Sequence, residues 1–342
     1  MALPLEKLLD DLIRRGASDL HLKARTPVYL RVRGELVATE HPVPEPADLE
    51  ALAARIFSAP QMAQLETDRQ VDAPFVPPDD RSRYRASACY QRGTISLVLR
   101  HIPRIVPSLA ALGVPNEAAA LMDARRGMLL VTGPASSGKT TTVAALIEAY
   151  NQAREGHVVT LEDPIEFVLE SKHCLINQRQ IGTDTPSFDA GLRHVLRQDP
   201  DVIFVGELRD LETVTIALAA AETGHLVLST LQTPNAATTL EQVIGMFPAQ
   251  QQAQSRLQIS LALAGVLSQQ LVLTRDQKRR VAAFEVLAPT EALRNLVRAN
   301  QTFRITDALE TTPGCRSMRR ALAELAAAGQ IAQEDVARYS TE

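Results

Sequence analysis

Residues 127–142 carry the feature that most restricts how this chain can fold. They read GMLLVTGPASSGKTTT and contain the pattern G-x-x-x-x-G-K-[ST], which begins at Gly133 and ends at Thr140. The apolar run at 128–131 predicts a buried strand before the pattern, and the segment 141–150, without Gly or Pro, predicts a helix after it. A strand, a glycine-rich loop and a helix in this order form a phosphate-binding loop. A plain glycine turn would not explain the lysine and threonine of the pattern.

The residues of this loop have distinct expected roles. Backbone N–H groups and the positive end of the helix dipole surround a polyphosphate. We expect the Lys139 ammonium group to reach the terminal phosphates and the Thr140 hydroxyl to hold Mg2+. The predicted nucleotide-binding residues are Gly133, Pro134, Ala135, Ser136, Ser137, Gly138, Lys139, Thr140 and Thr141.

Composition argues against several other classes of protein. Apolar residues make up 45% of the 342 residues and charged residues 22%, as in ordinary globular proteins. No apolar run reaches the ~20 residues of a membrane-spanning helix, and the N-terminus is too acidic for a signal peptide. Three widely spaced cysteines predict a reducing, cytoplasmic location. A net charge of −4, 4% aromatic residues and no Trp argue against a nucleic-acid partner.

The first 102 residues predict a small α+β domain. A stripe of apolar residues with helical spacing ends at Gly16, and polar and apolar residues alternate further along, which is typical of strands. The predicted helices are 5–15 and 48–57, and the predicted extended segments are 19–23, 28–36, 81–90 and 94–102. Residues 103–116 contain three prolines and predict a linker between domains.

Residues 117–342 predict a larger α/β domain, because short buried strands alternate with helices. The predicted strands are 128–131, 158–161, 202–205 and 226–229, and the predicted helices between them are 141–150, 188–197 and 213–221. This alternation is typical of a doubly wound parallel sheet. We expect one long helix at 248–270, and then helices near 291–299, 317–328 and 332–339.

Polar residues flank the strands of the predicted sheet, where ligands of α/β proteins bind. Glu207 follows the third strand and is the best candidate for a general base that orients or deprotonates water. Its alternatives are a solvated loop residue or a carboxylate at a helix N-terminus. Glu162 and Asp163 follow the second strand and are candidate Mg2+ or water ligands; the alternative is an acidic pair at a helix start. His225, at the edge of the fourth strand, is a weaker candidate, since a lone histidine is more often packed or on the surface.

Four stretches together resemble the secretion ATPases of type II secretion and type IV pili. They are VTGPASSGKTTT, TLEDPIEFV, LRQDPDVIFVGELRD and ETGHLVLSTLQT, and the resemblance covers about residues 18–310. It implies a PAS-like N-terminal domain followed by a RecA-like ATPase domain that uses ATP and Mg2+. It also implies a ring-shaped homo-hexamer on the cytoplasmic side of the inner membrane.

The resemblance assigns roles to particular residues. Glu162 and Asp163 match the Asp box, Glu207 matches the Walker B glutamate, and His225 matches the first histidine of the His box. Arg85 and Arg100 match arginines that reach the γ-phosphate, where a guanidinium would stabilise transition-state charge.

The sequence departs from the family at Gln232, where a second His-box histidine is expected. Glutamine can form hydrogen bonds but cannot become cationic or shuttle a proton. This position therefore leaves open a paralogue with slower or differently sensed hydrolysis.

Within the family, the chain is most similar to the PilT-type pilus-retraction branch. It lacks the four-cysteine zinc module and the longer N-terminal extension of extension and secretion members, and ALRNLVR at 292–298 resembles the AIRNLIR motif of retraction members. The resemblance implies a motor for pilus retraction that works with an inner-membrane platform protein and, in some systems, a second PilT-like ATPase. The alternatives are a nucleotide-binding accessory or regulatory (PilU-like) subunit, a type II secretion ATPase and a nucleic-acid translocase.

Overall fold

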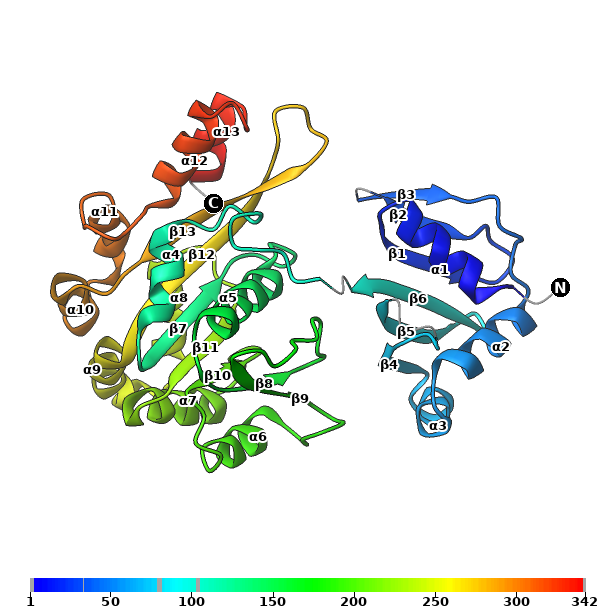
Figure 1. Cartoon of the computed structure of the whole chain (residues 1–342), viewed down its shortest axis with the longest axis horizontal. Helices are drawn as coiled ribbons and strands as arrows, with labels where there is room; N and C mark the ends of the chain where they lie inside the picture. Colours follow the sequence, from blue (N-terminus) through cyan, green and yellow to red (C-terminus); the bar gives the residue numbers. More distant parts are fainter. Residues whose placement is uncertain (1–2, 33, 79–81, 103–104, 341–342) are drawn as a thin grey trace. The chain divides into compact units, whose positions relative to one another are not determined.

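The structure is a computed structural model, and it describes residues 3–32, 34–78, 82–102 and 105–340. The chain separates into two compact units that divide between Ile105 and Val106 (Figure 1). Residues 106–116, most of the predicted linker, include Val106 and Leu109, which pack on the core of the second unit. The rest of that linker is Ile105, which belongs to the first unit, and 103–104, which lie outside the described residues.

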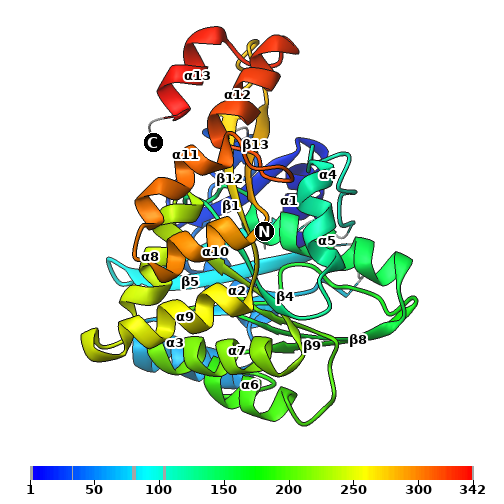
Figure 2. The same cartoon turned by 90° about the vertical axis from the view of Figure 1, so that its left-hand side faces the viewer.

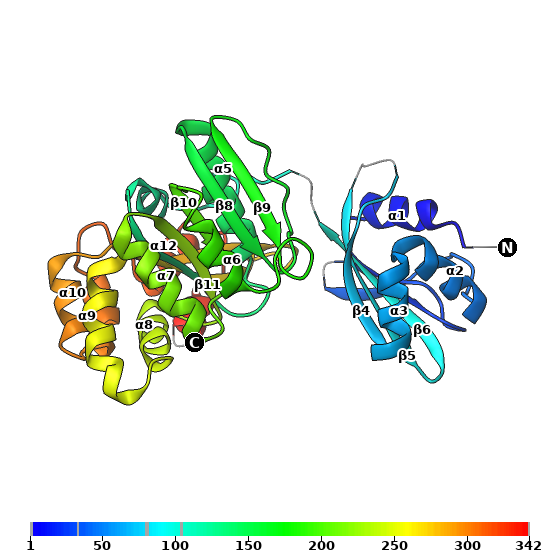
Figure 3. The same cartoon turned by 90° about the horizontal axis from the view of Figure 1, so that it is seen from below.

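The first unit is an antiparallel sheet with helices packed on it. Its strands lie in the order β3-β2-β1-β6-β5-β4. Helix α1 contacts β1 and α2 contacts β6. Helix α3 contacts β4 (Figure 3). The elements are α1 (Leu5–Arg14), β1 (Ala17–Lys23), β2 (Tyr29–Val32), β3 (Glu35–Ala38), α2 (Pro46–Ile56), α3 (Ala59–Asp68), β4 (Gln70–Phe75), β5 (Arg83–Gln91) and β6 (Thr94–Ile102).

Two local predictions in this unit were incomplete. The extended segment predicted at 28–36 is a hairpin of β2 and β3, with Gly34 at φ 90° between them. A positive φ of this kind favours glycine and turns the chain. Helix α3 and strand β4 were not predicted.

Arg85 and Arg100 are direct cross-strand partners on β5 and β6. Their neighbours Ala86 and Leu99 are fully buried on the core face, so the two arginines lie on the opposite face of the sheet. The Nε atom of Arg100 donates to Oδ1 of Asp19 at 2.8 Å.

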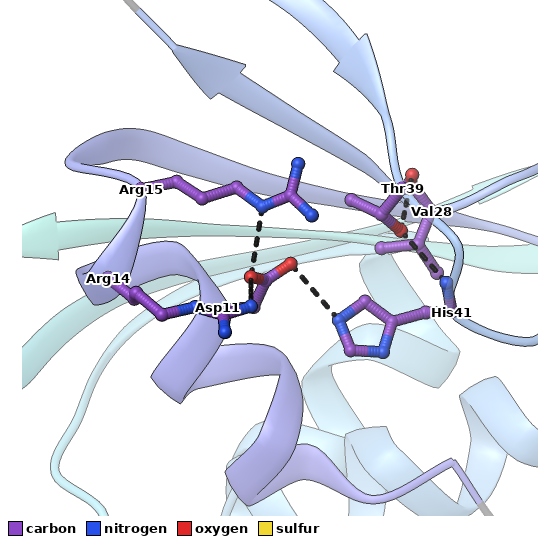
Figure 4. Close-up of polar contacts among 6 residues, drawn as sticks. All are labelled: Asp11, Arg14, Arg15, Val28, Thr39 and His41. Carbon is purple, nitrogen blue, oxygen red and sulfur yellow. Dashed lines mark hydrogen bonds and ion pairs between the residues drawn. The ribbon is translucent and has the colours of Figure 1, made fainter.

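Asp11 joins helix α1 to the connection that precedes α2 (Figure 4). Its carboxylate accepts hydrogen bonds from Arg14 at 2.6 Å and Arg15 at 2.9 Å, and it lies 3.3 Å from Nε2 of His41. Burial would raise the pKa of Asp11, but the two arginines outweigh it and lower the pKa. The cluster is internally paired, and we interpret it as structural.

The second unit is an α/β domain built on a mixed sheet. The strand order is β13-β12-β7-β11-β10-β8-β9, and every neighbouring pair is parallel except β12 and β13. The strands are β7 (Gly127–Thr132), β8 (Gly156–Glu162), β9 (Cys174–Gln180), β10 (Val202–Val205), β11 (Leu226–Leu231), β12 (Leu263–Leu273) and β13 (Arg280–Leu287).

Helices cover both faces of this sheet. Along β7, Met128 and Leu130 belong to the core that includes α6, α7 and α9, whereas Leu129 and Val131 belong to the core beneath α5. The helices are α4 (Asn116–Ala119), η1 (Ala120–Asp123), α5 (Lys139–Ala153), α6 (Phe188–Val195), α7 (Leu211–Thr223), α8 (Ala236–Gly245), η2 (Ala249–Gln251) and α9 (Gln252–Ala262). The predicted α/β fold is confirmed.

The long helix predicted at 248–270 is wrong. Helix α9 ends at Ala262, and the next residues form β12, which pairs with β7 on one side and β13 on the other. Because both faces of β12 are covered, its sequence lacks the polar–apolar alternation that marks a strand. Gly265 was the available signal: a Cβ there would lie 3.1 Å from the carbonyl oxygen of Leu287 and 2.8 Å from Leu121.

The C-terminal part of the chain forms further helices beside α9 and the β12–β13 hairpin. They are α10 (Glu291–Arg298), η3 (Thr302–Arg304), α11 (Ile305–Leu309), α12 (Met318–Ala327) and α13 (Gln333–Ser340). Helices α9 and α10 lie side by side (Figure 2). Arg294 of α10 donates to the carbonyl oxygens of Leu261 at 3.1 Å and Leu263 at 3.0 Å, and so caps the end of α9. No helix in the described ranges is long and apolar enough to span a membrane.

Candidate nucleotide-binding site

The phosphate loop connects the end of β7 to the start of α5. Gly133 has φ 145° and Gly138 has φ 90°, which other residues rarely adopt. A Cβ on Gly133 would lie 2.1 Å from the carbonyl oxygen of Gln269, and one on Gly138 would lie 2.9 Å from its Nε2. Both glycines are therefore required by backbone conformation and by the approach of β12.

The loop presents backbone donors that have no acceptor. Among the described residues, the N–H groups of Gly138, Lys139 and Thr140 donate to no protein group. They lie at the N-terminus of a helix of 15 residues, where the positive end of the dipole favours an anion. The loop is therefore arranged to accept phosphate oxygens.

Lys139 is held by its own loop. Its Nζ atom donates to the carbonyl oxygens of Gly133 and Pro134, both at 2.8 Å. Burial lowers the pKa of the ammonium group, and the charge of Glu207 partly opposes this shift. A phosphate beside Lys139 would offer a stronger, charged acceptor than these carbonyls.

A cavity of about 560 Å³ opens in front of the loop. Ala135, Ser136, Lys139 and Thr140 line it from the loop side. Residues at or after the carboxyl ends of the parallel strands supply much of its remaining polar wall, as expected for an α/β sheet. These residues are Glu162, Asp163, Glu207, Arg209, Thr230 and Gln232.

Glu162 is the last residue of β8 and is buried. Its Oε1 atom accepts from the hydroxyl of Thr160 at 2.6 Å and from Nε2 of Gln178 at 3.0 Å. Burial raises the pKa of Glu162, and these hydrogen bonds only partly oppose it. The described residues at 163–170 form no helix, so an acidic pair at a helix start is not the explanation for Glu162 and Asp163.

Glu207 lies in the loop between β10 and α7. The helix N-cap is Asp210, whose side chain accepts from the backbone of Thr213, so Glu207 is not the capping carboxylate. Arg209 forms an ion pair with Glu207, and its Nη1 atom lies 3.6 Å from Oδ2 of Asp163. Sequence reasoning missed Arg209, although it follows the predicted base by two residues.

His225 and Gln232 lie at opposite ends of β11. Because β11 runs parallel to β7, with Leu226 opposite Gly127, His225 lies at the edge of the sheet away from the phosphate loop. Six residues at about 3.3 Å each place it about 20 Å from that edge. His225 was predicted to form part of the phosphate site; it does not line the pocket of this chain, whereas Gln232 does. The Nδ1 atom of His225 lies 3.0 Å from the carbonyl oxygen of Ala220.

The remaining predicted residues lie around this site or in the other unit. Ser137 is buried, and its hydroxyl has no partner in the described part of the chain. Thr141 is in the first turn of α5. Arg85 and Arg100 belong to the first unit, and their contact with a phosphate stays a prediction.

The loop, its free donors, the lysine and the carboxylates across the cavity define a phosphate-loop nucleotide-binding protein. A comparison with protein families matches residues 2–338 to the type II/IV secretion system proteins. The chain belongs to this family.

Individual relatives are similar over nearly their whole length. The type IV pilus retraction ATPase PilT of Pseudomonas aeruginosa is 40% identical, over 97% of this chain and 96% of its own. The type IV pilus ATPase PilU of the same organism is 34% identical, over 98% and 88%. A crystal structure of the pilus retraction motor PilT with bound ADP superposes with a TM-score of 0.92 at 39% identity, covering 99% of this chain and 98% of the other.

Proposed function

We propose that this chain is an ATP-hydrolysing motor of type IV pilus machinery that powers pilus retraction. The main evidence is the similarity to a pilus retraction ATPase along nearly the full length of both chains. The complete phosphate loop, with Glu207 across the cavity, supports hydrolysis.

In this proposal the loop N–H groups and Lys139 hold the phosphates of ATP, and Glu207 orients or deprotonates the attacking water. Mg2+ would be held by the Thr140 hydroxyl and the phosphates, with Asp163 and Glu162 acting on it directly or through water. These oxygen donors suit the ion, which supplies charge stabilisation at the phosphates.

The first unit would act as a PAS-like domain that brings Arg85 and Arg100 to the γ-phosphate. The pairing of these arginines on adjacent strands supports a joint role. Domain closure would then depend on the nucleotide state.

We further propose a homo-hexamer in the cytoplasm, peripheral to the inner membrane and acting on a pilus platform protein. A second PilT-like ATPase is a candidate partner, and no nucleic acid is required. Deletion of the gene tests the proposal: we expect cells with pili but without twitching motility, restored by the intact gene. Normal twitching in the deletion strain would contradict it.

A second candidate is a nucleotide-binding accessory subunit that hydrolyses ATP slowly beside an active motor. The observation that favours it is Gln232, which lines the cavity where a histidine was expected. A steady-state ATPase assay separates the two. Low activity that rises strongly in Gln232→His would support the accessory subunit, whereas high activity that changes little would support the motor.

A further inference from the structure

Gln269 on β12 touches the phosphate loop and is not among the residues that line the cavity. It is 3% exposed, and its carboxamide bridges two parts of the loop–helix segment. Its Nε2 atom donates to the carbonyl oxygen of Ser137 at 2.6 Å, and its Oε1 atom accepts from the hydroxyl of Thr142 at 2.6 Å. We propose that Gln269 is a positioning residue that sets the phosphate loop in its nucleotide-binding shape.

The geometry of one peptide bond links this contact to phosphate binding. Because the peptide between Ser137 and Gly138 is planar and trans, its carbonyl and its N–H group point in opposite directions. Nε2 of Gln269 holds the carbonyl toward β12, and the Gly138 N–H is thereby turned away from β12. Within the described residues this N–H has no acceptor, so it is available to a phosphate oxygen.

The contact between Oε1 of Gln269 and the Thr142 hydroxyl helps to fix the orientation of the carboxamide. The Ser137 carbonyl oxygen can only accept a hydrogen bond, so it requires the amide nitrogen of Gln269. The Thr142 hydroxyl then donates to the amide oxygen. The assignment of oxygen and nitrogen therefore follows from the network. Thr142 is 1% exposed, so neither contact can be replaced by bulk water.

The backbone of Gln269 adds a steric constraint. Its carbonyl oxygen would lie 2.1 Å from a Cβ on Gly133, and its Nε2 atom 2.9 Å from one on Gly138. Gln269 therefore touches the loop near both glycines. The neighbouring residue Ser268 accepts from Thr132, the last residue before the loop, at 3.0 Å, so β12 holds the loop at its start as well.

The proposal rests on the proposed function only in assuming that the loop binds a nucleotide. We would therefore measure ADP and tripolyphosphate affinity on the full-length protein, without turnover. Gln269→Glu keeps the size and the acceptor for Thr142, but its carboxylate cannot donate to Ser137 and repels that carbonyl. We expect both ligands to bind about tenfold more weakly or worse, because a buried contact is lost beside the loop.

Three further variants make the result specific. Thr142→Val removes the other contact and leaves the bond to Ser137, so we expect a smaller loss of ADP affinity than in Gln269→Glu. Gln269→Met fills the same volume without a donor, and it serves if Gln269→Glu does not fold; we expect the same tenfold loss. Gln251→Glu, an exposed glutamine on η2, controls for the added charge and should bind as wild type.

Hydrogen exchange of the Gly138 amide reports on the loop directly. In Gln269→Glu or Gln269→Met, we expect ADP to protect this amide less than it does in wild type. Wild-type ADP and tripolyphosphate affinity in a folded Gln269→Met protein would overturn the proposal. If wild type binds ADP but does not hydrolyse ATP, the proposed function fails while Gln269 is still tested by binding.

Discussion

Arg209 forms an ion pair with Glu207, the side chain that we propose as the general base. The same guanidinium lies 3.6 Å from a carboxylate oxygen of Asp163 and 5.9 Å from the ring centre of Phe188. One cation therefore offsets two of the carboxylates that line the cavity. ATP brings further negative charge into the cavity, so we expect the positive charge of Arg209 to favour ATP binding.

We predict that Arg209→Gln weakens ATP binding about fivefold. Removal of the guanidinium leaves Glu207 and Asp163 facing the phosphates without compensation, and a half-exposed ion pair contributes about 1 kcal/mol. Isothermal titration with Mg-ATP checks this, and Arg209→Lys should retain part of the affinity. Equal affinity in all three proteins would show that Arg209 has no electrostatic role in binding.

The buried carboxyl group of Glu162 should make the stability of the folded protein depend on pH. Burial raises its pKa above the usual 4.5, so its contribution to stability is present below the unfolded-state pKa and is lost as pH rises through the folded-state pKa. Glu162→Gln keeps the acceptor oxygen and cannot ionise, so its advantage over wild type should grow as pH rises from about 4.5 and then level off.

Thermal denaturation of the nucleotide-free protein across this pH range measures the effect. Glu170→Gln, the same substitution at an exposed glutamate that follows the same strand, is the matched control. A difference for Glu162→Gln that is constant with pH would contradict the raised pKa.

Glu285 on β13 is expected to stabilise the second unit through its buried hydrogen bonds. Its buried carboxyl accepts from the backbone of Ala236 at 2.8 Å, and it also receives hydrogen bonds from Ser268 and the backbone of Met318. It thus ties the N-termini of α8 and α12 to the sheet. We expect Glu285→Ala to lower the free energy of unfolding by about 3 kcal/mol, because several buried donors lose their acceptor.

Glu285→Gln keeps an acceptor of the same size and should stay within about 1 kcal/mol of wild type. Differential scanning calorimetry checks both variants, and a loss of about 3 kcal/mol corresponds to roughly 6–12 °C for a domain of this size. If Glu285→Ala and Glu285→Gln melt together, the acceptor role is wrong.

Substitution of His225 tests whether this residue lies away from the nucleotide. Because it lies at the far edge of the sheet from the phosphate loop, we expect His225→Gln to bind ADP within about twofold of wild type. Gln269→Met changes a residue that contacts the loop, and it is the contrasting variant for which we expect weaker ADP binding. A large loss of ADP affinity in isolated His225→Gln protein would contradict the placement of His225 that the structure gives.

The sequence was sufficient for those parts of the site that adjoin strand ends. Gly133 to Thr140 lie in a local strand–loop–helix unit. Glu162 ends one buried strand and Glu207 lies two residues after another, so the sequence pattern and the parallel-sheet rule were enough to group them. His225 was misplaced because a residue before a strand lies at the opposite edge from one after it. Gln232, seven residues later, lies at the edge of the cavity.

The contribution of β12 could not be predicted in this way. A strand buried on both faces has no period that separates it from a helix, and Gln269 is brought to the loop only by pairing between segments about 130 residues apart. Arg209 was missed for a different reason: its ion pairs depend on side-chain geometry across two loops.

Steady-state ATP hydrolysis by wild type and Glu207→Gln, measured with Mg-ATP affinity on the same preparations, tests directly whether this chain is an ATP-hydrolysing motor with Glu207 as its base. We expect clear hydrolysis by wild type, a loss of about 100-fold or more in the variant, and similar ATP affinity in both. Hydrolysis by Glu207→Gln at the wild-type rate would contradict the assignment of the base. A wild-type protein that binds ATP without hydrolysing it would contradict the motor.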